Sequence, residues 1–481
     1  MVMSPITLKE KDANTVIHQF IFPFSIRKSA YKEMRADLEQ RGFVPFDIRN
    51  TKLENAFYGE KHQISHRELE HLFLPFTNQF LFPSNTQDAL SFQRYSKIVN
   101  EDYEMLTPNS ILPFHIHSVD IVLCPYEIGM FTIRTALTRP CTFSESLEFA
   151  RRFRALENLE PKDELSYIKS KNAIYDEILS FFNEELLPDL LHWLDDEDKE
   201  DTSFERLPFF INERMFTISL YGLPADETIT NADLFRAVRL HGFNAQNEAY
   251  IGSSSPEYIA EFVKRRIYER WAPNTYYVAD EHVLSCMTNA SHGRTITLAN
   301  EMYGRYYYIF LLNLFHKIVL LKLSNHYGRL QLDSNRDRVE ELIRGITLFS
   351  SRFYYREMVS ESQLQDVFQL LRRMHGNDEL LKDVKQTLSA LYDYQSNTTS
   401  KRSDYMLRIL TIFTVISGIY GMNQVIDDLK YPIHWKRAEH YSVFEYLALV
   451  VTFIGIAVSL VLTITTLWGI VKTSIRRRRN P

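Results

Sequence analysis

Residues 405–422 read YMLRILTIFTVISGIYGM, and residues 446–471 read YLALVVTFIGIAVSLVLTITTLWGIV. The second stretch contains no charged residue, and the first contains a single one, Arg408, near its start. A helix of about 20 apolar residues is long enough to cross the hydrocarbon core of a bilayer. The two stretches therefore predict two transmembrane helices close to the C-terminal end of the chain.

Basic residues beside the two predicted spans indicate their orientation. Lys401 and Arg402 precede the first span, whereas Lys472 and the arginines at 476–479 follow the second. The intervening loop, residues 423–445, carries only three basic residues. Because positively charged flanks stay on the cytoplasmic side, we expect a multi-pass protein of the plasma (inner) membrane with both termini in the cytoplasm.

A third apolar stretch, residues 306–323, carries Asn313, His316 and Lys317 at its centre. A charged side chain at the middle of a bilayer costs about 3 kcal/mol on insertion scales. We therefore interpret this stretch as a buried or oligomer-interface helix of the soluble part, not as a span.

The composition of the chain is that of a globular protein, since 45% of its 481 residues are hydrophobic. The net charge of −6 gives no basic footprint for nucleic acid. The cysteines Cys124, Cys141 and Cys286 are too far apart for zinc-binding spacing and suggest a reducing compartment. No phosphate-binding loop, nucleophile elbow or H-E-x-x-H motif occurs. We therefore expect that the protein is not an enzyme.

The first 290 residues mix strand and helix patterns, which predicts an α/β domain. Residues 119–124 and 131–137 have the pattern of a hairpin, and residues 215–220 and 275–284 are also rich in strand formers. Helical patterns lie between them. Thr142 and Glu145 have the spacing of a capping box for a helix reaching about Leu156. Residues 165–193 are predicted as a longer helix kinked at Pro188.

From residue 300 the pattern becomes almost continuously helical. Apolar residues recur at spacings of three and four, and no proline occurs between Pro273 and Pro432. The predicted organisation is a cytoplasmic α/β domain (1–290), a long-helix stalk (291–404) and a transmembrane domain (405–481). His115 and His117 share one strand face and are metal-ligand candidates, but no third ligand lies nearby in sequence. A structural role is favoured for them.

A polar seam runs along the helix that enters the membrane. Counting back every third or fourth residue from Gly421 meets small, polar or acidic residues almost throughout. The candidate pore-lining residues are Gly418, Thr414, Thr411, Leu407, Asp404, Ser400, Asn397 and Asp393. Polar groups at membrane depth usually line a water-filled path, so several copies around an axis would form a pore. The alternative is that the small residues simply allow close helix packing.

The first span closes with Tyr420, Gly421, Met422 and Asn423. In this position the sequence SGIYGMN (417–423) resembles the CorA superfamily of divalent metal-cation channels and transporters. Glu361-Ser362, Leu364 and Asp366-Val367 also resemble the long-helix signature of that superfamily. The resemblance is specific over residues 300–481 and rests on element order before that.

The resemblance implies a funnel-shaped homopentamer that passes a hydrated divalent cation, most simply Mg²⁺, which gives up its water reluctantly. Tyr420, Gly421, Met422 and Asn423 would form the outer selectivity ring, with Asn423 binding the hydrated ion. A single helix from 361 to 422, about 93 Å long, would lead to it. Regulatory divalent ions at acidic subunit interfaces would hold the pore shut.

Two departures from the superfamily pattern bear on selectivity and gating. The loop after Asn423 lacks the common Met-Pro-Glu-Leu segment, and Ser400 and Asp404 stand where relatives often place apolar gate residues. Asp404 is therefore a candidate metal-binding residue. Alternatives are a transporter of Zn²⁺, Co²⁺ or Ni²⁺ within the same superfamily, or a membrane-anchored sensor or scaffold that conducts nothing.

Overall fold

The computed structural model describes residues 6, 8–28, 30–84, 88, 90–158, 166–188, 190–195, 214–270, 272–328 and 336–427, and isolated helical positions between 443 and 457. The chain divides into two compact units, Met1–Leu388 and Ser389–Pro481. The predicted α/β character of the N-terminal part is confirmed. The domain boundaries predicted at residues 290 and 404 stay a prediction.

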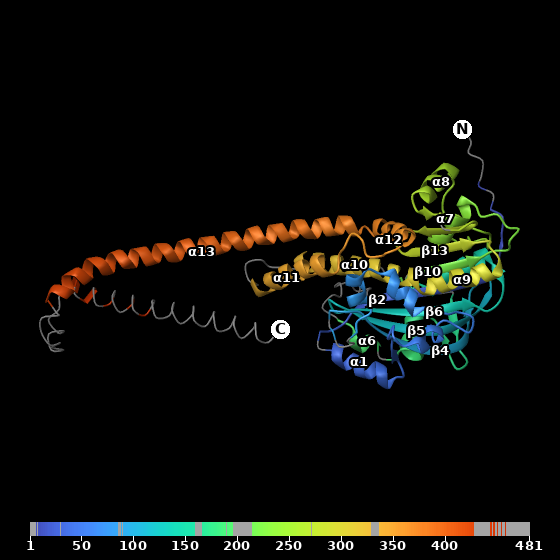
Figure 1. The fold of residues 1–481 in the computed structure, drawn as a ribbon, viewed down its shortest axis with the longest axis horizontal. Coiled ribbons are helices and arrows are strands. Elements are labelled where there is room, and N and C mark those ends of the chain that lie inside the picture. The colour runs from blue at the N-terminus through green and yellow to red at the C-terminus, as the bar shows by residue number, and fades with distance from the viewer. Residues whose placement is uncertain are drawn as a thin grey trace. The chain divides into compact units, whose positions relative to one another are not determined.

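An 11-stranded mixed sheet forms the centre of the first unit (Figure 1). Its order is β11-β12-β13-β10-β2-β6-β5-β4-β8-β9, with β3 beside β4, and only β10 and β13 pair in parallel. The strands are β2 (Thr15–Ser25), β3 (Val44–Pro45), β4 (Gln93–Leu106), β5 (Ile111–Cys124), β6 (Ile128–Leu137), β8 (Tyr167–Lys169), β9 (Ile174–Tyr175), β10 (Phe216–Gly222), β11 (Ile267–Tyr268), β12 (Thr275–Ala279) and β13 (Val283–Thr288). The short strands β1 (Asp12–Ala13) and β7 (Cys141–Thr142) pair separately.

The predicted hairpin is confirmed as β5 and β6, with Cys124 opposite Ile128. Tyr126 and Glu127 take positive φ angles of 66° and 53° in the turn. The strand predicted at 215–220 is β10. The stretch 275–284 is not one strand, because the chain reverses after β12, where the Asp280 backbone N–H donates to Val283 O at 2.8 Å, and returns as β13.

Aromatic side chains cover one face of the sheet and pack under several short helices. Phe20 on β2 meets Phe153 at 4.6 Å between ring centroids, and both are fully buried. The helices that share this core are α1 (Tyr31–Gln40), α4 (Phe143–Phe153), α5 (Ile178–Phe181), α7 (Asn231–Arg239) and α8 (Pro256–Lys264). Burial of so many aromatic rings is the main source of stability of this face.

The predicted capping box is present at the start of α4. The Thr142 hydroxyl accepts from Glu145 N at 3.2 Å, and Glu145 Oε2 accepts from Thr142 N at 2.8 Å. We expect Thr142→Ala to lower the free energy of unfolding by about 1 kcal/mol, because one helix-start N–H loses its acceptor. Urea unfolding of both proteins measures this, and an unchanged midpoint would show that α4 is held by packing alone.

The long helix predicted over residues 165–193 is wrong. This segment forms β8, β9, α5, a π-helical turn (Phe182–Leu186) and α6 (Leu190–Trp193). The reason is tertiary, since the outer part of β4 offers an unpaired edge to which β8 adds. Two ion pairs across that edge join Lys169 to Glu104 and Lys171 to Glu101.

Helices cover the opposite face of the sheet, with α9 (His292–Tyr303) and α10 (Arg305–Gly328) running across it (Figure 1). Within the described residues, one helical stretch, His292–Tyr327, which comprises α9 and nearly all of α10, is long and apolar enough to span a membrane. However, 83% of its apolar window is buried within the protein. Asn313 and His316 are fully buried. The interpretation of this stretch as a buried helix is confirmed.

The remaining helices include η1 (Thr51–Asn55), α2 (His66–Leu72), α3 (Pro75–Leu81), α11 (Arg336–Arg352), α12 (Ser362–Met374) and α13 (Asn377–Asp427). The single helix predicted from 361 to 422 is wrong, because the chain breaks between α12 and α13. Gly376 has φ of +68°, a left-handed conformation that ends a helix and that glycine adopts without strain.

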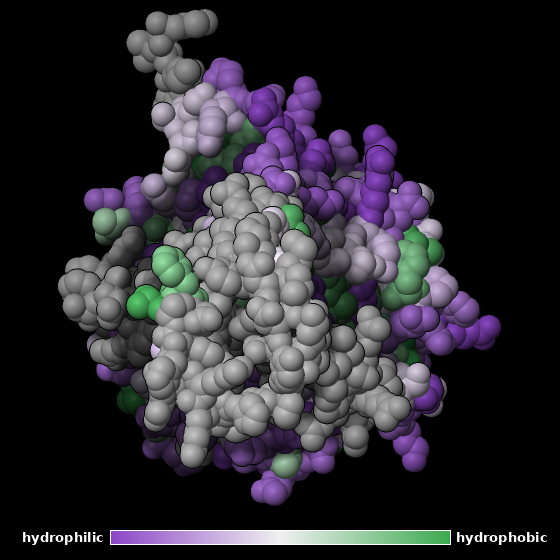
Figure 2. All heavy atoms as spheres, turned by 90° about the vertical axis from the view of Figure 1, so that its left-hand side faces the viewer, coloured by the Kyte–Doolittle hydropathy of each residue, from purple (hydrophilic) through white to green (hydrophobic). Residues whose placement is uncertain are grey.

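The coloured surface in Figure 2 is mostly hydrophilic, with small separate hydrophobic patches. Exposed apolar side chains of the first unit, such as Val44, Ile98 and Ile174, come from different elements. Scattered exposure of this kind is normal for a protein surface.

Candidate functional site

Every residue predicted to line a pore or to bind an ion lies on α13, which has 51 residues and is about 77 Å long. These residues are Asp393, Asn397, Ser400, Asp404, Leu407, Thr411, Thr414, Gly418, Tyr420, Gly421, Met422 and Asn423. The helix continues past Asn423 to Asp427. The Gly-Met-Asn tripeptide therefore lies within α13, whereas the sequence had suggested that it stands at the end of the first span.

Leu407, Thr411, Thr414 and Gly418 lie on one face of α13, since their spacing of three and four keeps them within one stripe. All four are exposed in the single chain, and Leu407 is 65% exposed. Asp393 is exposed as well. The other predicted residues are placed on the helix by its backbone alone.

The two threonines of this stripe orient their hydroxyl groups in the same way. Thr411 Oγ1 donates to Leu407 O, and Thr414 Oγ1 donates to Leu410 O, each at 2.7 Å. Because each hydroxyl has one hydrogen, this bond leaves only acceptor lone pairs on the oxygen. The stripe thus offers hydrogen-bond acceptors to a donor such as the outer hydrogens of a hydrated cation.

Apolar residues flank the stripe and are also exposed in the single chain. Met406 is 45%, Ile409 38% and Leu410 54% exposed. In the region of the second predicted span, Leu447, Val450 and Ile454 are helical and about half exposed. Apolar surface of this extent needs a cover, either lipid or another helix.

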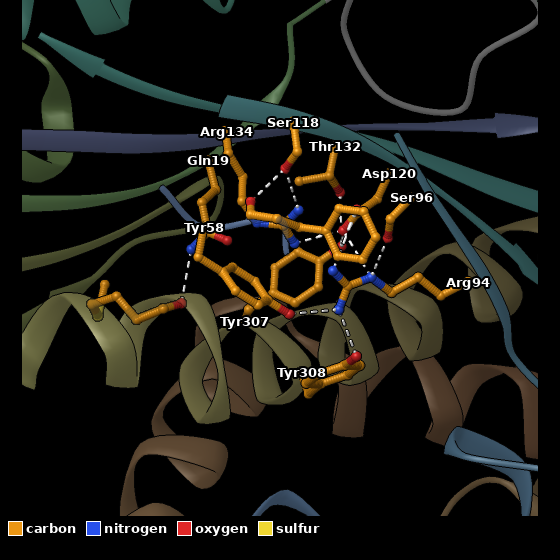
Figure 3. Close-up of polar contacts among 12 residues, drawn as sticks. Gln19, Tyr58, Arg94, Ser96, Ser118, Asp120, Thr132, Arg134, Tyr307 and Tyr308 are labelled. Atoms are coloured by element: carbon orange, nitrogen blue, oxygen red, sulfur yellow. Dashed lines mark hydrogen bonds and ion pairs between the residues drawn. The ribbon is translucent and has the colours of Figure 1, made fainter. Parts of the chain in front are cut away.

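A row of polar residues crosses four strands of the sheet in the first unit, beneath α9 and α10 (Figure 3). Gln19, Arg134 and Ser118 are cross-strand neighbours, as are Thr132, Asp120 and Ser96. Arg94 enters the same cluster from β4. Figure 3 shows the two guanidinium groups converging on the carboxylate of Asp120.

Asp120 is the only acidic residue that bonds the two arginines among the described contacts. Arg134 Nη2 lies 2.5 Å and Arg94 Nε 3.0 Å from Asp120 Oδ2. Burial alone raises the pKa of Asp120, but the attraction of Arg134 and Arg94 outweighs it and lowers this pKa to about 2. Asp120 is therefore an anion at neutral pH, and the cluster carries one net positive charge.

Tyrosines of α10 complete the cluster and tie the helix to the sheet. Arg94 Nη1 donates to Tyr308 OH at 2.8 Å, and Tyr307 OH lies 3.0 Å from Thr132 Oγ1. On α9, Met302 O accepts from Gln19 Nε2 at 2.8 Å. The cluster is almost fully buried. Its contacts join α9 and α10 to the sheet, so its chemistry is that of a brace that fixes how these helices dock.

Sequence reasoning missed this cluster. Thr132 and Arg134 alternate with Phe131 and Ile133, so the alternation shows a polar face on β6. The signal was present in each strand. The alignment of four strands that brings the residues together is not visible in the sequence.

The histidines considered as metal ligands do not form a metal centre. His115 Nδ1 lies 2.7 Å from Asp102 Oδ1, and the rings of His115 and His117 are 4.7 Å apart between centroids. The described residues contain no group of three or more His, Cys, Asp or Glu side chains suited to hold a metal ion. The expectation of a structural role for these histidines stays a prediction.

No protein-family model matches the chain, and comparisons with curated proteins and with solved structures found no match.

Proposed function

We propose that this protein is a channel or transporter for hydrated divalent cations, most simply Mg²⁺, formed by α13 helices of several copies around a central axis. A homopentamer in a funnel-shaped arrangement with two spans per copy is the form that the sequence resemblance favours. Flux is passive and driven by the membrane potential, since the sequence contains no phosphate-binding loop.

The observation that carries the proposal is the acceptor character of Thr411 and Thr414 on an exposed stripe of a helix with apolar flanks. Water molecules around a cation point their hydrogens outward, toward such acceptors. An anion orients its water the opposite way and finds no donor on these two hydroxyls. The stripe therefore favours a cation that keeps its water, as Mg²⁺ does.

Purified protein in proteoliposomes tests the proposal. At an inside-negative potential of 100 mV, a divalent cation entering gains about 4.6 kcal/mol, so we expect Mg²⁺ uptake that stops when the potential is collapsed. Comparison with Zn²⁺, Co²⁺ and Ni²⁺ tests the transition-metal alternative. A monomeric or dimeric protein without ion uptake would instead support the sensor or scaffold.

Asp404 is predicted to form a ring of carboxylates on the ion path, near the cytoplasmic end of the first predicted span. Such a ring repels itself when empty and attracts a divalent ion. We expect Asp404→Asn to lower divalent conductance and to weaken block by cytoplasmic divalent ions. Asp404→Leu should form a dry constriction and close the pore.

Single-channel or flux measurements on both variants check this prediction, with Asp366→Asn on α12 as a control at an exposed acidic residue outside the stripe. The competing interpretation pairs Asp404 with Lys401 or Arg408, at helix spacings of three and four. Unchanged conductance in both assembled variants would favour that pairing and remove Asp404 from the ion path.

A further inference from the structure

The joint between α12 and α13 consists of His375 and Gly376. Both helices are fully hydrogen-bonded up to the joint, since His375 N donates to Leu371 O at 2.9 Å and Leu380 N donates to Gly376 O at 3.0 Å. Chain neighbours aside, no atom of the described residues lies within 4 Å of the position that a Cβ on Gly376 would take. The space beside Gly376 is thus open, and the contacts of the joint are made by the side chains around it.

Polar contacts hold the start of α13 in place. Asp378 Oδ1 accepts from Arg372 Nε on α12 at 2.8 Å and from Tyr354 OH at 3.0 Å. Asn377 Nδ2 donates to Asn313 O on α10 at 3.0 Å. Leu381 and Val384, in the first turns of α13, are also buried. These contacts lie wholly within the first unit.

The His375 ring fills the centre of the joint. It is 3% exposed and lies edge-on to Phe310, at 5.4 Å between centroids, and to Phe216, at 6.1 Å. Neither ring nitrogen makes a hydrogen bond of good geometry to the described residues. The nearby carbonyl oxygen of Asn313 favours the protonated ring, but this oxygen lies inside α10, where it serves the helix N–H four residues on, and it also accepts from Asn377.

Lys317 is the cation that acts on His375, whereas burial lowers the pKa of His316 to about 3 and that of His282 to about 4, so both of these rings are neutral at neutral pH. Lys317 and His316 face it from α10, His282 faces it from the turn between β12 and β13, and Arg372 lies on α12. Of the acidic groups nearby, Asp378 pairs with Arg372, while Asp280 and Glu281 act on Lys317. Burial, followed by repulsion from Lys317, lowers the pKa of His375 to about 3.

We propose that His375 makes this joint a proton-operated latch. The neutral ring seats between Phe216 and Phe310 and keeps the first turns of α13 against α10. Between these two phenylalanines a protonated ring has neither a free hydrogen-bond acceptor nor an anion beside it. The charged ring therefore moves out into solvent, and the start of α13 detaches from α10.

The expected size of the response follows from linkage. In the closed latch the pKa of His375 is about 3, whereas a solvated histidine has a pKa of about 6.5. The open state therefore binds more protons, and the closed state loses stability as the pH falls below about 6.5. Between pH 7.5 and 5.0, the ratio of open to closed molecules should rise about 30-fold.

Hydrogen exchange of the full-length protein in nanodiscs at pH 7.5 and pH 5.0 measures the ratio of open to closed molecules. Rates are corrected for the intrinsic effect of pH, and amides 377–388 are compared with core amides of β5. We expect about 30-fold faster relative exchange at pH 5.0. In His375→Phe, which keeps a ring but cannot take a proton, the change should fall below about 3-fold.

His71→Phe, at an exposed histidine of α2, is the control and should keep the full response. If His375→Phe does not fold, His375→Leu replaces it, with the same expectation. The proposal is overturned if the wild-type amides 377–388 do not respond, or if the response persists in the folded variant without His375. Because the readout is local exchange, it does not depend on whether the protein conducts ions.

Discussion

Asn423→Ala is expected to abolish ion uptake while leaving the assembled protein intact. In the proposed channel, one amide from each copy binds the hydration shell of the ion at the outer mouth. Each hydrogen bond of this kind contributes about 1 kcal/mol, so a ring of them stabilises the bound ion by about 3–5 kcal/mol. Its loss corresponds to at least a hundredfold slower uptake.

Radioactive or fluorescent ion uptake into proteoliposomes measures the effect, and size-exclusion chromatography checks assembly. Gln424→Ala is the matched control, because it also removes an amide from α13 but lies about 100° around the helix from Asn423. We expect it to retain most of the uptake. Normal uptake by an assembled Asn423→Ala protein would disprove the role of this residue.

Asp120→Asn is expected to lower the free energy of unfolding of the first unit by about 3–5 kcal/mol. The substitution keeps the shape of the side chain but leaves Arg94 and Arg134, both buried, without their shared carboxylate. An uncompensated buried charge is among the most destabilising changes in a protein. Urea unfolding followed by circular dichroism gives the magnitude.

Two variants sharpen the test of Asp120. Arg134→Met leaves one arginine with one carboxylate, so it should cost less than Asp120→Asn, and the reverse order would show that net charge does not control this cluster. Glu341→Gln breaks the pair of Lys28 and Glu341, whose side chains are 78% and 72% exposed. Exposed pairs contribute little, so we expect a change below about 1 kcal/mol.

Local patterns in the sequence predicted those parts of the fold that local physics determines. The β5–β6 hairpin, the strand β10 and the capping box at Thr142 follow from alternation and from residues three apart. The buried helix α10 follows from Asn313 and His316 within an apolar stretch. In each case the signal lies within about 25 residues of chain.

The errors arose where distant segments decide local structure. Residues 165–193 have helical spacing, but the free edge of β4 recruits Tyr167–Lys169 as a strand. The break at Gly376 could have been predicted, since glycine often ends a helix. The apolar spacing on both sides of Gly376 nevertheless suggested one continuous helix. The predicted pore stripe stays a prediction, because the relevant neighbours of α13 would be other copies of the same helix.

The position of β2 in the middle of the sheet has a consequence for the order of folding. β2 pairs with β6 on one side and with β10 on the other, and Phe20 lies opposite Thr217, almost 200 residues later in the chain. During synthesis the first long strand must wait for β10 to emerge, so the nascent chain carries an open sheet edge while almost 200 further residues are made. The apolar residues that begin at 405 leave the ribosome later still. Translation order thus gives the sheet time to close before a hydrophobic segment is available to aggregate with it.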